Sequence, residues 1–424
     1  MLVFRKVRRP AKVMVLHILS GEKLGDMIKT RFQIFVWIFG CVALTHCQTS
    51  SQSSEVVTSA KKVAASTALT PIKIKYAKNF RVQYFDHYKV VTVTKAFSDT
   101  ADSLQYVLVP RNSPVPPQFK SSQIVRTPIR SLITLSSTHV ALTDVLGLSQ
   151  SIVGNANNSF ISEKSQLISR IKQGKVAEVG NSRNFNKELV LSLQADALMM
   201  SGVYTADYQK YQAMLGKHTC LIVNTEWLEQ HPLARAEWIK FLALFYNKEQ
   251  VADQAFQKIE ANYLQTKKLV ANVTKHPTVF LNLPRKGTWY MARGKSYVAQ
   301  FIKDAGANYL WKDTKGVGSE PLDYEVVFAK AYQADFWLNV GLTQNLPELL
   351  SKDDRFRKFE AFQKGNVYNN NRLLNKNSGN DYWMTGLVNP HLVLADLVKI
   401  FHPELLPQHQ FVYYKKLPAH EDTH

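Results

Sequence analysis

The stretch KEQVADQAFQKIEANYLQTKKLVANV, residues 248–273, decides the fold of this chain. No proline or glycine occurs between Pro232 and Pro277, and apolar residues recur along the stretch at the spacing of one helix face. These residues are Val251, Ala255, Phe256, Ile259 and Tyr263. At 1.5 Å per residue the helix would run about 39 Å. Such a long helix in mid-chain, preceded by a predicted helix over 236–246, indicates a connector between two domains.

Strands and helices alternate on both sides of this connector. Apolar strands are predicted at residues 129–135, 197–201 and 220–223 before it, and at 278–283, 336–340 and 366–368 after it. Helices are predicted at residues 139–146, 188–193, 297–305, 324–331, 356–363 and from Pro390 onward. Apolar strands separated by helices are typical of mainly parallel sheets, so the sequence predicts two α/β units. Residues 71–109 alternate in the β manner instead and end at a proline cluster, which predicts a small antiparallel β region over 71–117.

The first residues of the chain carry the features of an export signal. Lys29 and Arg31 precede the uncharged, mostly apolar run 32–44. This run is shorter than the roughly 20 residues that a membrane-spanning helix needs. The sequence leaves open whether Met1 or Met27 is the true start.

A lipid-attachment site follows the apolar run. The tetrapeptide Leu44-Thr45-His46-Cys47 resembles a bacterial lipobox, although His46 stands where a small residue is usual. The Ser/Thr/Gln-rich stretch after Cys47 is typical of a flexible tether. We therefore predict an N-terminal extension and signal peptide over 1–46, lipidation at Cys47, and a tether over 47–70. After cleavage at Cys47, Cys220 is the one remaining unmodified thiol, and its apolar surroundings predict a buried structural role.

The charge balance narrows the class of partner. The chain has a net charge of +20, which favours anionic partners. Its basic residues are scattered, without an arginine-rich arm. An exported protein seldom meets nucleic acid, so we expect no nucleic-acid partner. An anionic chelate or an anionic membrane surface fits the charge better.

Several short motifs, in order, resemble one protein family. They are LITLSS (132–137), IVG (152–154), PLARAEW (232–238), GNDYW (379–383), and ADL (395–397) before HPE (402–404). The chain resembles the periplasmic binding proteins of ferric-siderophore, haem and vitamin B12 importers, especially their Bacteroidetes lipoprotein forms, over residues 70–415. The resemblance implies a class III periplasmic-binding-protein fold, with two Rossmann-like lobes joined by a long helix. It divides the chain into an N-terminal lobe over 71–233, which includes the β region, interlobe helices over 234–275, a C-terminal lobe over 276–415, and a tail over 416–424.

The function implied by the resemblance is transport. A monomeric, lipid-anchored periplasmic protein would capture an iron-siderophore-type chelate and deliver it to an ABC permease dimer with its ATPase. Vitamin B12 (cobalamin) and haem are alternative ligands of the same class. The family's permease-docking carboxylates match Glu188 and Glu325 here, on opposite lobes. Taken without the resemblance, both are ordinary first-turn glutamates favoured by the helix dipole.

The ligand site is predicted from sheet topology. In open parallel α/β sheets, ligands bind outside the carboxyl ends of the strands. The loops expected there offer Ser137, Thr138, Tyr204 and Trp227 in the first lobe, and Arg285, Trp289, Tyr290, Arg372 and Trp383 in the second. Ser136, Glu226, Asn339 and Thr343 lie in the same loops. Aromatic walls suit a large flat ligand, and arginines suit its anionic groups.

No catalytic motif accompanies these residues. The sequence contains no G-x-S-x-G elbow, and Gly294-Lys295-Ser296 lacks the upstream P-loop glycine because Trp289 occupies that position. The histidines are mostly dispersed, and the pair His420 and His424 lies in the polar tail. We therefore predict no catalytic residue, no direct metal site and no resident cofactor, with the metal held inside a chelate. An exported α/β enzyme is the alternative class.

Overall fold

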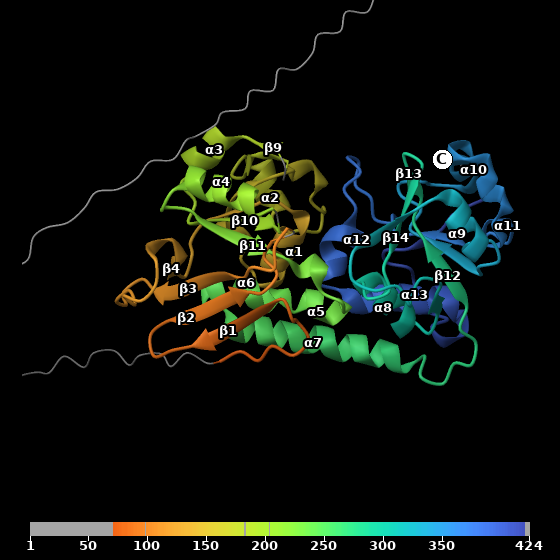
Figure 1. Ribbon diagram of the computed structural model, residues 1–424, viewed down its shortest axis with the longest axis horizontal. Helices are drawn as coiled ribbons and strands as arrows, with labels where there is room; N and C mark the ends of the chain where they lie inside the picture. The colour runs from red at the N-terminus through yellow and green to blue at the C-terminus, as the bar shows by residue number, and fades with distance from the viewer. Residues whose placement is uncertain (1–70, 98, 182–183, 203, 420–424) are drawn as a thin grey trace, which may run out of the picture. The chain divides into compact units, whose positions relative to one another are not determined.

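A computed structural model describes residues 71–97, 99–181, 184–202 and 204–419 (Figure 1). The predicted signal peptide, Cys47, the tether and His420 and His424 lie outside these residues. The described residues belong to one compact unit. Within them no single helix is long and apolar enough to cross a membrane. The helical segments Asp381–Leu387 and Pro390–Phe401 are bent by 118° where they meet. Only when they are taken together do they have the length and apolar composition of a membrane-spanning segment.

The first lobe is built on a five-stranded parallel sheet in the order β11-β10-β5-β6-β7. Its strands are β5 (Leu132–Thr134), β6 (Ile152–Asn155), β7 (Ala177–Glu178), β10 (Ala197–Ser201) and β11 (Cys220–Asn224). The lobe's helices are α1 (Ser137–Val145), α2 (Ile168–Lys172), α3 (Lys187–Ser192) and α4 (Thr205–Leu215), with a short ribbon of β8 (Gly180–Asn181) and β9 (Asn184–Phe185). Strands β5 and β10 consist of apolar residues and threonine or serine, as a sheet covered on both faces requires.

The second lobe repeats this plan. Its main sheet has the order β15-β12-β17-β18-β19, parallel except for β19. The strands are β12 (Thr278–Leu281), β15 (Asn308–Tyr309), β17 (Phe336–Leu338), β18 (Val367–Asn369) and β19 (Lys415–Lys416), beside an antiparallel sheet of β13 (Pro284–Arg285), β14 (Thr288–Ala292) and β16 (Ser319–Leu322). The helices are α8 (Tyr297–Asp304), α9 (Tyr324–Ala331), α10 (Leu346–Lys352), α11 (Glu360–Gln363), α12 (Asp381–Met384) and α13 (Pro390–Phe401). The predicted α/β fold with two parallel-sheet lobes is confirmed.

An additional sheet covers the first lobe. It has the order β1 (Phe80–Tyr84), β2 (Lys89–Val93), β3 (Leu104–Pro110) and β4 (Ile124–Thr127). The first three strands are antiparallel, as predicted, and β4 adds a parallel pairing beyond residue 117. The sheet is fixed to the lobe by Tyr106, whose hydroxyl donates to the Leu221 carbonyl (3.1 Å) and accepts from the Val223 amide (2.8 Å).

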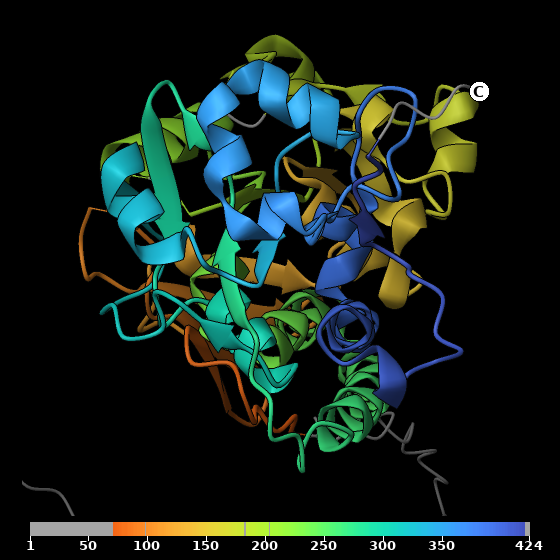
Figure 2. The same cartoon turned by 90° about the vertical axis from the view of Figure 1, so that its right-hand side faces the viewer.

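The connector consists of α5 (Pro232–Ala236), α6 (Trp238–Tyr246) and α7 (Glu249–Lys268). Figure 1 shows α7 running beneath both lobes, and Figure 2 shows it beside α13 of the second lobe, against which it packs. The 20 residues of α7 span about 30 Å, so the helix is shorter than predicted. Residues 269–273 form turns, and Val270 and Val273 lie against Gly306 of the second lobe.

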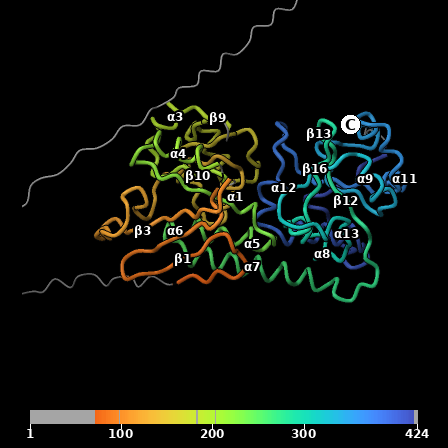
Figure 3. The backbone as a smooth tube through the Cα atoms, viewed as in Figure 1, coloured from red at the N-terminus to blue at the C-terminus, as the bar shows by residue number. Residues whose placement is uncertain are grey.

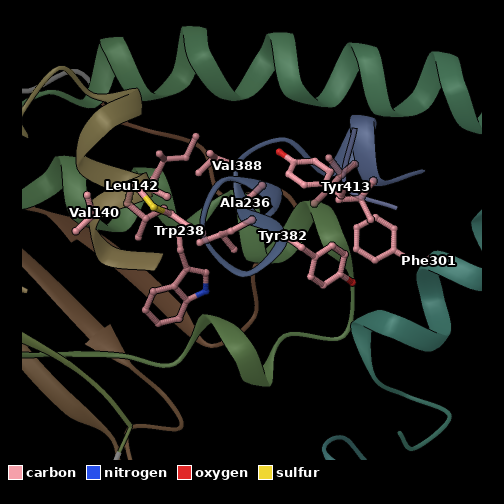
Figure 4. Packing of buried hydrophobic residues seen from close by; sticks show 14 of the residues in the cluster. Val140, Leu142, Ala236, Trp238, Phe301, Tyr382, Val388 and Tyr413 are labelled. Carbon is pink, nitrogen blue, oxygen red and sulfur yellow. The ribbon is translucent and has the colours of Figure 1, made fainter. Parts of the chain in front are cut away.

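Buried side chains from both lobes form one continuous apolar cluster. Figure 4 shows Leu142 of α1 and Trp238 of α6 near Val388 and Tyr382 of the second lobe. All four side chains are buried. Interiors packed in this way have few arrangements of similar energy, so we expect the two lobes to move little against each other.

Candidate ligand-binding cleft

A cleft lies between the lobes at the carboxyl ends of both parallel sheets. One pocket of about 580 Å³ is lined mainly by second-lobe residues that follow β12, β17 and β18, together with Ser137 and Phe160 of the first lobe. A second pocket of about 440 Å³ is lined mainly by first-lobe residues that follow β5, β10 and β11. Both pockets include Ser137 and Trp383, so we treat them as one interlobe cleft. This is where the topology rule places a ligand.

The first-lobe wall begins where α1 leaves β5. Ser136 caps this helix, with its hydroxyl accepting from the Thr138 amide (3.3 Å) and lying 2.9 Å from the Thr138 hydroxyl. This cap turns the chain directly from strand into helix. Ser137 and Thr138 therefore stand at the helix start on the cleft wall. Trp227 joins them from the turn after β11 and is partly exposed.

A buried ion pair closes the bottom of this wall. Arg235 of α5 donates to the Glu226 carboxylate at 2.7 Å, and both side chains are largely buried. The Arg235 guanidinium also lies 3.9 Å from the ring centre of Tyr297 in the second lobe. Burial acts to lower the pKa of Arg235, but the charge and hydrogen bond of Glu226 and the neighbouring tyrosine Tyr297 together outweigh it, so the pKa is raised overall. The pair therefore adds no net charge to the cleft.

The second-lobe wall is formed by asparagines. Strands β12, β17 and β18 are neighbours in the sheet, and each is followed at once by an asparagine: Asn282, Asn339 and Asn370. All three line the larger pocket, as does Asn380. Sequence reasoning pointed to Asn339 and missed Asn282 and Asn370. The available signal was an asparagine after each of two apolar strands and the run Asn369-Asn370-Asn371 at the end of a third.

The structure brings some of the predicted contact residues together and leaves others apart. Ser137, Thr138, Trp227, Arg285 and Trp383 line the cleft. Tyr290 lies with Arg285 in an adjoining groove on the β13–β14 hairpin. Tyr204 and Arg372 are exposed but line neither pocket of the cleft.

Trp289, which was predicted to contact the ligand, lies in the core of the second lobe and lines neither pocket of the cleft. Its side chain is 0% exposed, and its indole N–H donates to the Leu281 carbonyl at 2.8 Å. Its ring packs 5.9 Å from Trp337 and 6.0 Å from Phe359, between ring centres. Side chains alternate between the faces of a strand, so Trp289 faces the lobe core and Tyr290 faces outward.

A second-lobe loop crosses to the first lobe beside the cleft. We call residues 374–380 the strap. Asn375 donates from its side chain to the carbonyls of Ser159 (2.8 Å) and Ile161 (3.3 Å). Gly379 lies so close to Phe160 that a Cβ there would come within 2.6 Å of the Phe160 carbonyl oxygen. Figure 3 shows α12, which follows the strap, at the boundary of the lobes near α1.

The described residues offer no group of three or more His, Cys, Asp or Glu side chains placed to hold a metal ion. Cys220, which sequence reasoning placed in the interior, lines a different pocket between β3 and β11, and burial raises the pKa of its thiol to about 12. A thiol with so high a pKa is a poor nucleophile and a poor metal ligand near neutral pH.

The two predicted docking carboxylates lie on different lobes. Glu188 is exposed in the first turn of α3, and Glu325 is exposed in the first turn of α9, with 77% of its side chain accessible. Arg355 lies 3.6 Å from Glu325 but is held more closely by Asp353, at 2.7 Å. Both carboxylates are therefore available to a partner.

Comparisons with known proteins agree with this architecture. Residues 132–371 match the model of a family described as periplasmic binding protein. An uncharacterised lipoprotein of Methanocaldococcus jannaschii is 27% identical over 376 residues, which cover 82% of this chain and 86% of that protein.

Solved structures share the fold at low sequence identity. A periplasmic binding protein of Veillonella parvula superposes with a TM-score of 0.52 at 13% identity, over 77% of this chain and 98% of its own. The Helicobacter pylori protein Ceue, solved with Ni(II) bound, superposes with a TM-score of 0.51 at 13% identity, over 68% of this chain and 88% of its own.

Proposed function

Because the chain belongs to the periplasmic binding protein family, we propose that it is the substrate-binding lipoprotein of an ABC importer for an iron-siderophore-type chelate. Cobalamin and haem are alternative ligands of the same transporter class. The cleft between the lobes carries this proposal. It is large, partly aromatic, and placed at the carboxyl ends of two parallel sheets.

The chemistry of the cleft supports a chelated metal over a bare ion. Metal ions bind to clusters of histidine, cysteine or carboxylate ligands, and the described residues contain no such cluster. Trp227 and Trp383 instead offer partly exposed aromatic faces. These suit a large ligand that supplies the metal's ligands itself.

The proposed transport cycle involves no covalent step. A chelate enters the cleft, and the lobes close by a small amount because the apolar cluster and α7 span both. Glu188 and Glu325 then set the register on a permease dimer, where ATP hydrolysis drives release. Lipidation at Cys47 would hold the protein at the periplasmic face of a membrane. The lipoprotein description of the Methanocaldococcus jannaschii relative supports this anchor.

Ligand capture tests the proposal. The purified full-length chain is incubated with ferric siderophores, haemin or cyanocobalamin and examined by native mass spectrometry and visible absorption. We expect a one-to-one adduct with a visible band for one of these classes. Chemical conversion of the chelate during incubation would instead indicate an enzyme, and absence of any adduct would contradict the proposal.

A further inference from the structure

Three asparagine side chains line the second-lobe wall of the interlobe cleft, and we call this part of the wall the amide floor. Asn282, Asn339 and Asn370 follow three adjacent strands and all line the cleft at the carboxyl edge of the sheet; we call these three residues the row. Asn282 donates to the Tyr290 carbonyl (2.9 Å), and Asn339 accepts from the Tyr414 hydroxyl (3.0 Å). The first bond uses the amide nitrogen of Asn282, and the second uses the amide oxygen of Asn339. The Asn282 Oδ1 and the Asn339 Nδ2 have no partner among the described residues.

Asn370 is the member of the row that points most directly to a ligand. Its side chain is 4% exposed and lines the cleft, and the Tyr382 hydroxyl lies beside it, but its Nδ2 makes no hydrogen bond of good geometry among the described residues. Buried polar groups in native proteins are almost always paired. An unpaired donor in the cleft wall can therefore donate a hydrogen bond to an acceptor atom on a ligand that enters the cleft.

Backbone conformation does not explain the row. Asn282 and Asn339 have φ values of +68° and +65°, a region that glycine adopts as readily as asparagine. Asn370 is not among the residues with positive φ. Glycine would adopt the backbone conformation of Asn282 and Asn339 equally well, and the backbone of Asn370 does not need a residue that tolerates positive φ. The feature that all three share is the amide group facing the cleft.

The cleft carries little charge. Among the described residues that line its two pockets, the charged side chains are Glu226, Arg235 and Arg285, and the first two neutralise each other. Arg285 is exposed at the β13–β14 hairpin, with Lys286 beyond it. The chain's net charge of +20 is therefore not concentrated at the ligand site. This overturns the reason for expecting an anionic ligand there.

The rim of the cleft is apolar. Phe160, Leu342 and Trp383 line the larger pocket with exposed fractions of 45%, 58% and 50%. They surround the amide floor from both lobes and from the segment that follows the strap. An amide floor inside an apolar rim suits a ligand with apolar faces and a polar, uncharged periphery.

Resting on the proposed function, we infer that the ligand is a metal chelate of zero or low net charge, with a coordination shell complete in itself and amide groups or metal-bound hydroxamate oxygens open to hydrogen bonding. Amide side chains both donate to and accept from such groups. A triply anionic ferric tris-catecholate would need several unpaired cations in the cleft wall. Two kinds of chelate share the favoured chemistry: neutral ferric tris-hydroxamates and amide-bearing corrinoids.

Competitive binding to the full-length chain tests this inference. Tryptophan fluorescence quenching is measured with four probes: a neutral ferric tris-hydroxamate (ferrichrome), cyanocobalamin, a ferric tris-catecholate, and haemin. We expect one of the first two to bind at least about tenfold more tightly than the catecholate or haemin. Which of the two binds identifies the source of the chemistry. Its Kd should change little between low salt and about 0.5 M NaCl, because screening weakens only charge–charge attraction.

Two variants locate the interaction. Asn339→Gly keeps the left-handed backbone and removes the amide, and Asn370→Ala removes the unpaired donor. Each should weaken the preferred neutral probe about tenfold, since the ligand loses a buried hydrogen bond. Asn247→Gly is the matched control: Asn247 also has positive φ (+53°) but ends α6, outside the cleft. Thermal unfolding confirms that each variant is folded.

The outcomes separate the two proposals. Tightest binding of the catecholate or haemin, or loss of affinity with salt, overturns the inference and leaves the import function standing. The inference is also overturned if Asn339→Gly and Asn370→Ala bind the preferred neutral probe with the same Kd as Asn247→Gly. Failure of all four probes to bind contradicts the proposed function itself.

Discussion

His139 illustrates how one buried side chain sets a pH dependence. It lies in the first turn of α1, fully buried, and neither ring nitrogen has a hydrogen-bond partner of good geometry among the described residues. Burial lowers the pKa of His139 from 6.5 to about 3, and the Met199 backbone opposes this only in part. The folded protein therefore keeps this imidazole neutral at pH values where the unfolded chain takes up a proton.

The sign of the effect on stability follows directly. Below pH 6.5 the unfolded state binds a proton that the folded state excludes. The free energy of unfolding therefore decreases as the pH is lowered. Between pH 6.5 and 4.5 the free energy of unfolding loses about 2 kcal/mol from the protonation of this one group. His139→Leu removes the titrating group, and we expect a shallower decrease over this range in urea unfolding. The exposed His218→Leu serves as control; equal slopes for the two variants would refute the assignment.

Residue identity alone does not reveal which of two adjacent aromatic residues faces a ligand. Trp289 and Tyr290 both follow the first strand of the second lobe, and both were predicted to line the site. They occupy consecutive positions of β14, so one must face the core and the other must face away. The register of β14 against β16 decides between them, and register depends on contacts far along the chain.

At the scale of elements, strands and helices were predictable where periodicity is strong. The spacing of apolar residues marks α7, and the short apolar runs mark β10, β11, β12 and β17. The end of α7 was not predictable, because Leu269 and Val270 continue the helical pattern. Packing of Val270 and Val273 against Gly306 replaces the last turn with a tighter one. No local stop signal encodes that contact.

The strap is the element whose effect on the cleft is most directly testable. Gly379 faces the backbone of Phe160, and a Cβ at Gly379 would lie 2.6 Å from the Phe160 carbonyl oxygen and 2.7 Å from the Asn375 Nδ2. Separations this short force the backbones apart. Gly379→Ala should therefore detach the strap from the first lobe, with faster amide hydrogen exchange in residues 157–162 and 374–380 and faster ligand dissociation.

A neighbouring glycine provides the control for the strap. At Gly386 an added Cβ would meet no atom closer than 3.4 Å, so Gly386→Ala should leave exchange in both segments unchanged. If Gly379→Ala exchanges at the rate of the unmodified protein, the strap does not depend on this close contact. Faster exchange across the whole chain would indicate general destabilisation instead of local release.

For the described body of the protein, the architecture was predictable and the ligand chemistry was not. Strand–helix alternation on both sides of a long helix indicates two lobes without any knowledge of contacts. The net charge suggested an anionic ligand, but charge summed over a chain says nothing of where the charges lie. The fold places an ion pair and a row of amides at the cleft, and the amides become adjacent only when β12, β17 and β18 pair.

The proposed docking on a permease needs both lobes at once. Glu188 and Glu325 lie on α3 and α9, in different lobes, and each is exposed. Two separated carboxylates set an orientation that one cannot, because a single contact leaves the body free to rotate. Neither residue lines the interlobe cleft. Ligand capture and docking should therefore be separable by mutation.

The double substitution Glu188→Ala with Glu325→Ala tests this separation. We expect unchanged Kd for the chelate and at least about tenfold slower uptake into cells that express the cognate importer, because both docking charges are lost. The control is Glu163→Ala with Glu404→Ala, which removes one exposed glutamate from each lobe and should leave uptake unchanged.

Arg355 already offsets part of the Glu325 charge, so Glu188→Ala alone should slow uptake more than Glu325→Ala alone. Uptake by the double variant at the rate of the control would show that the docking surface lies elsewhere.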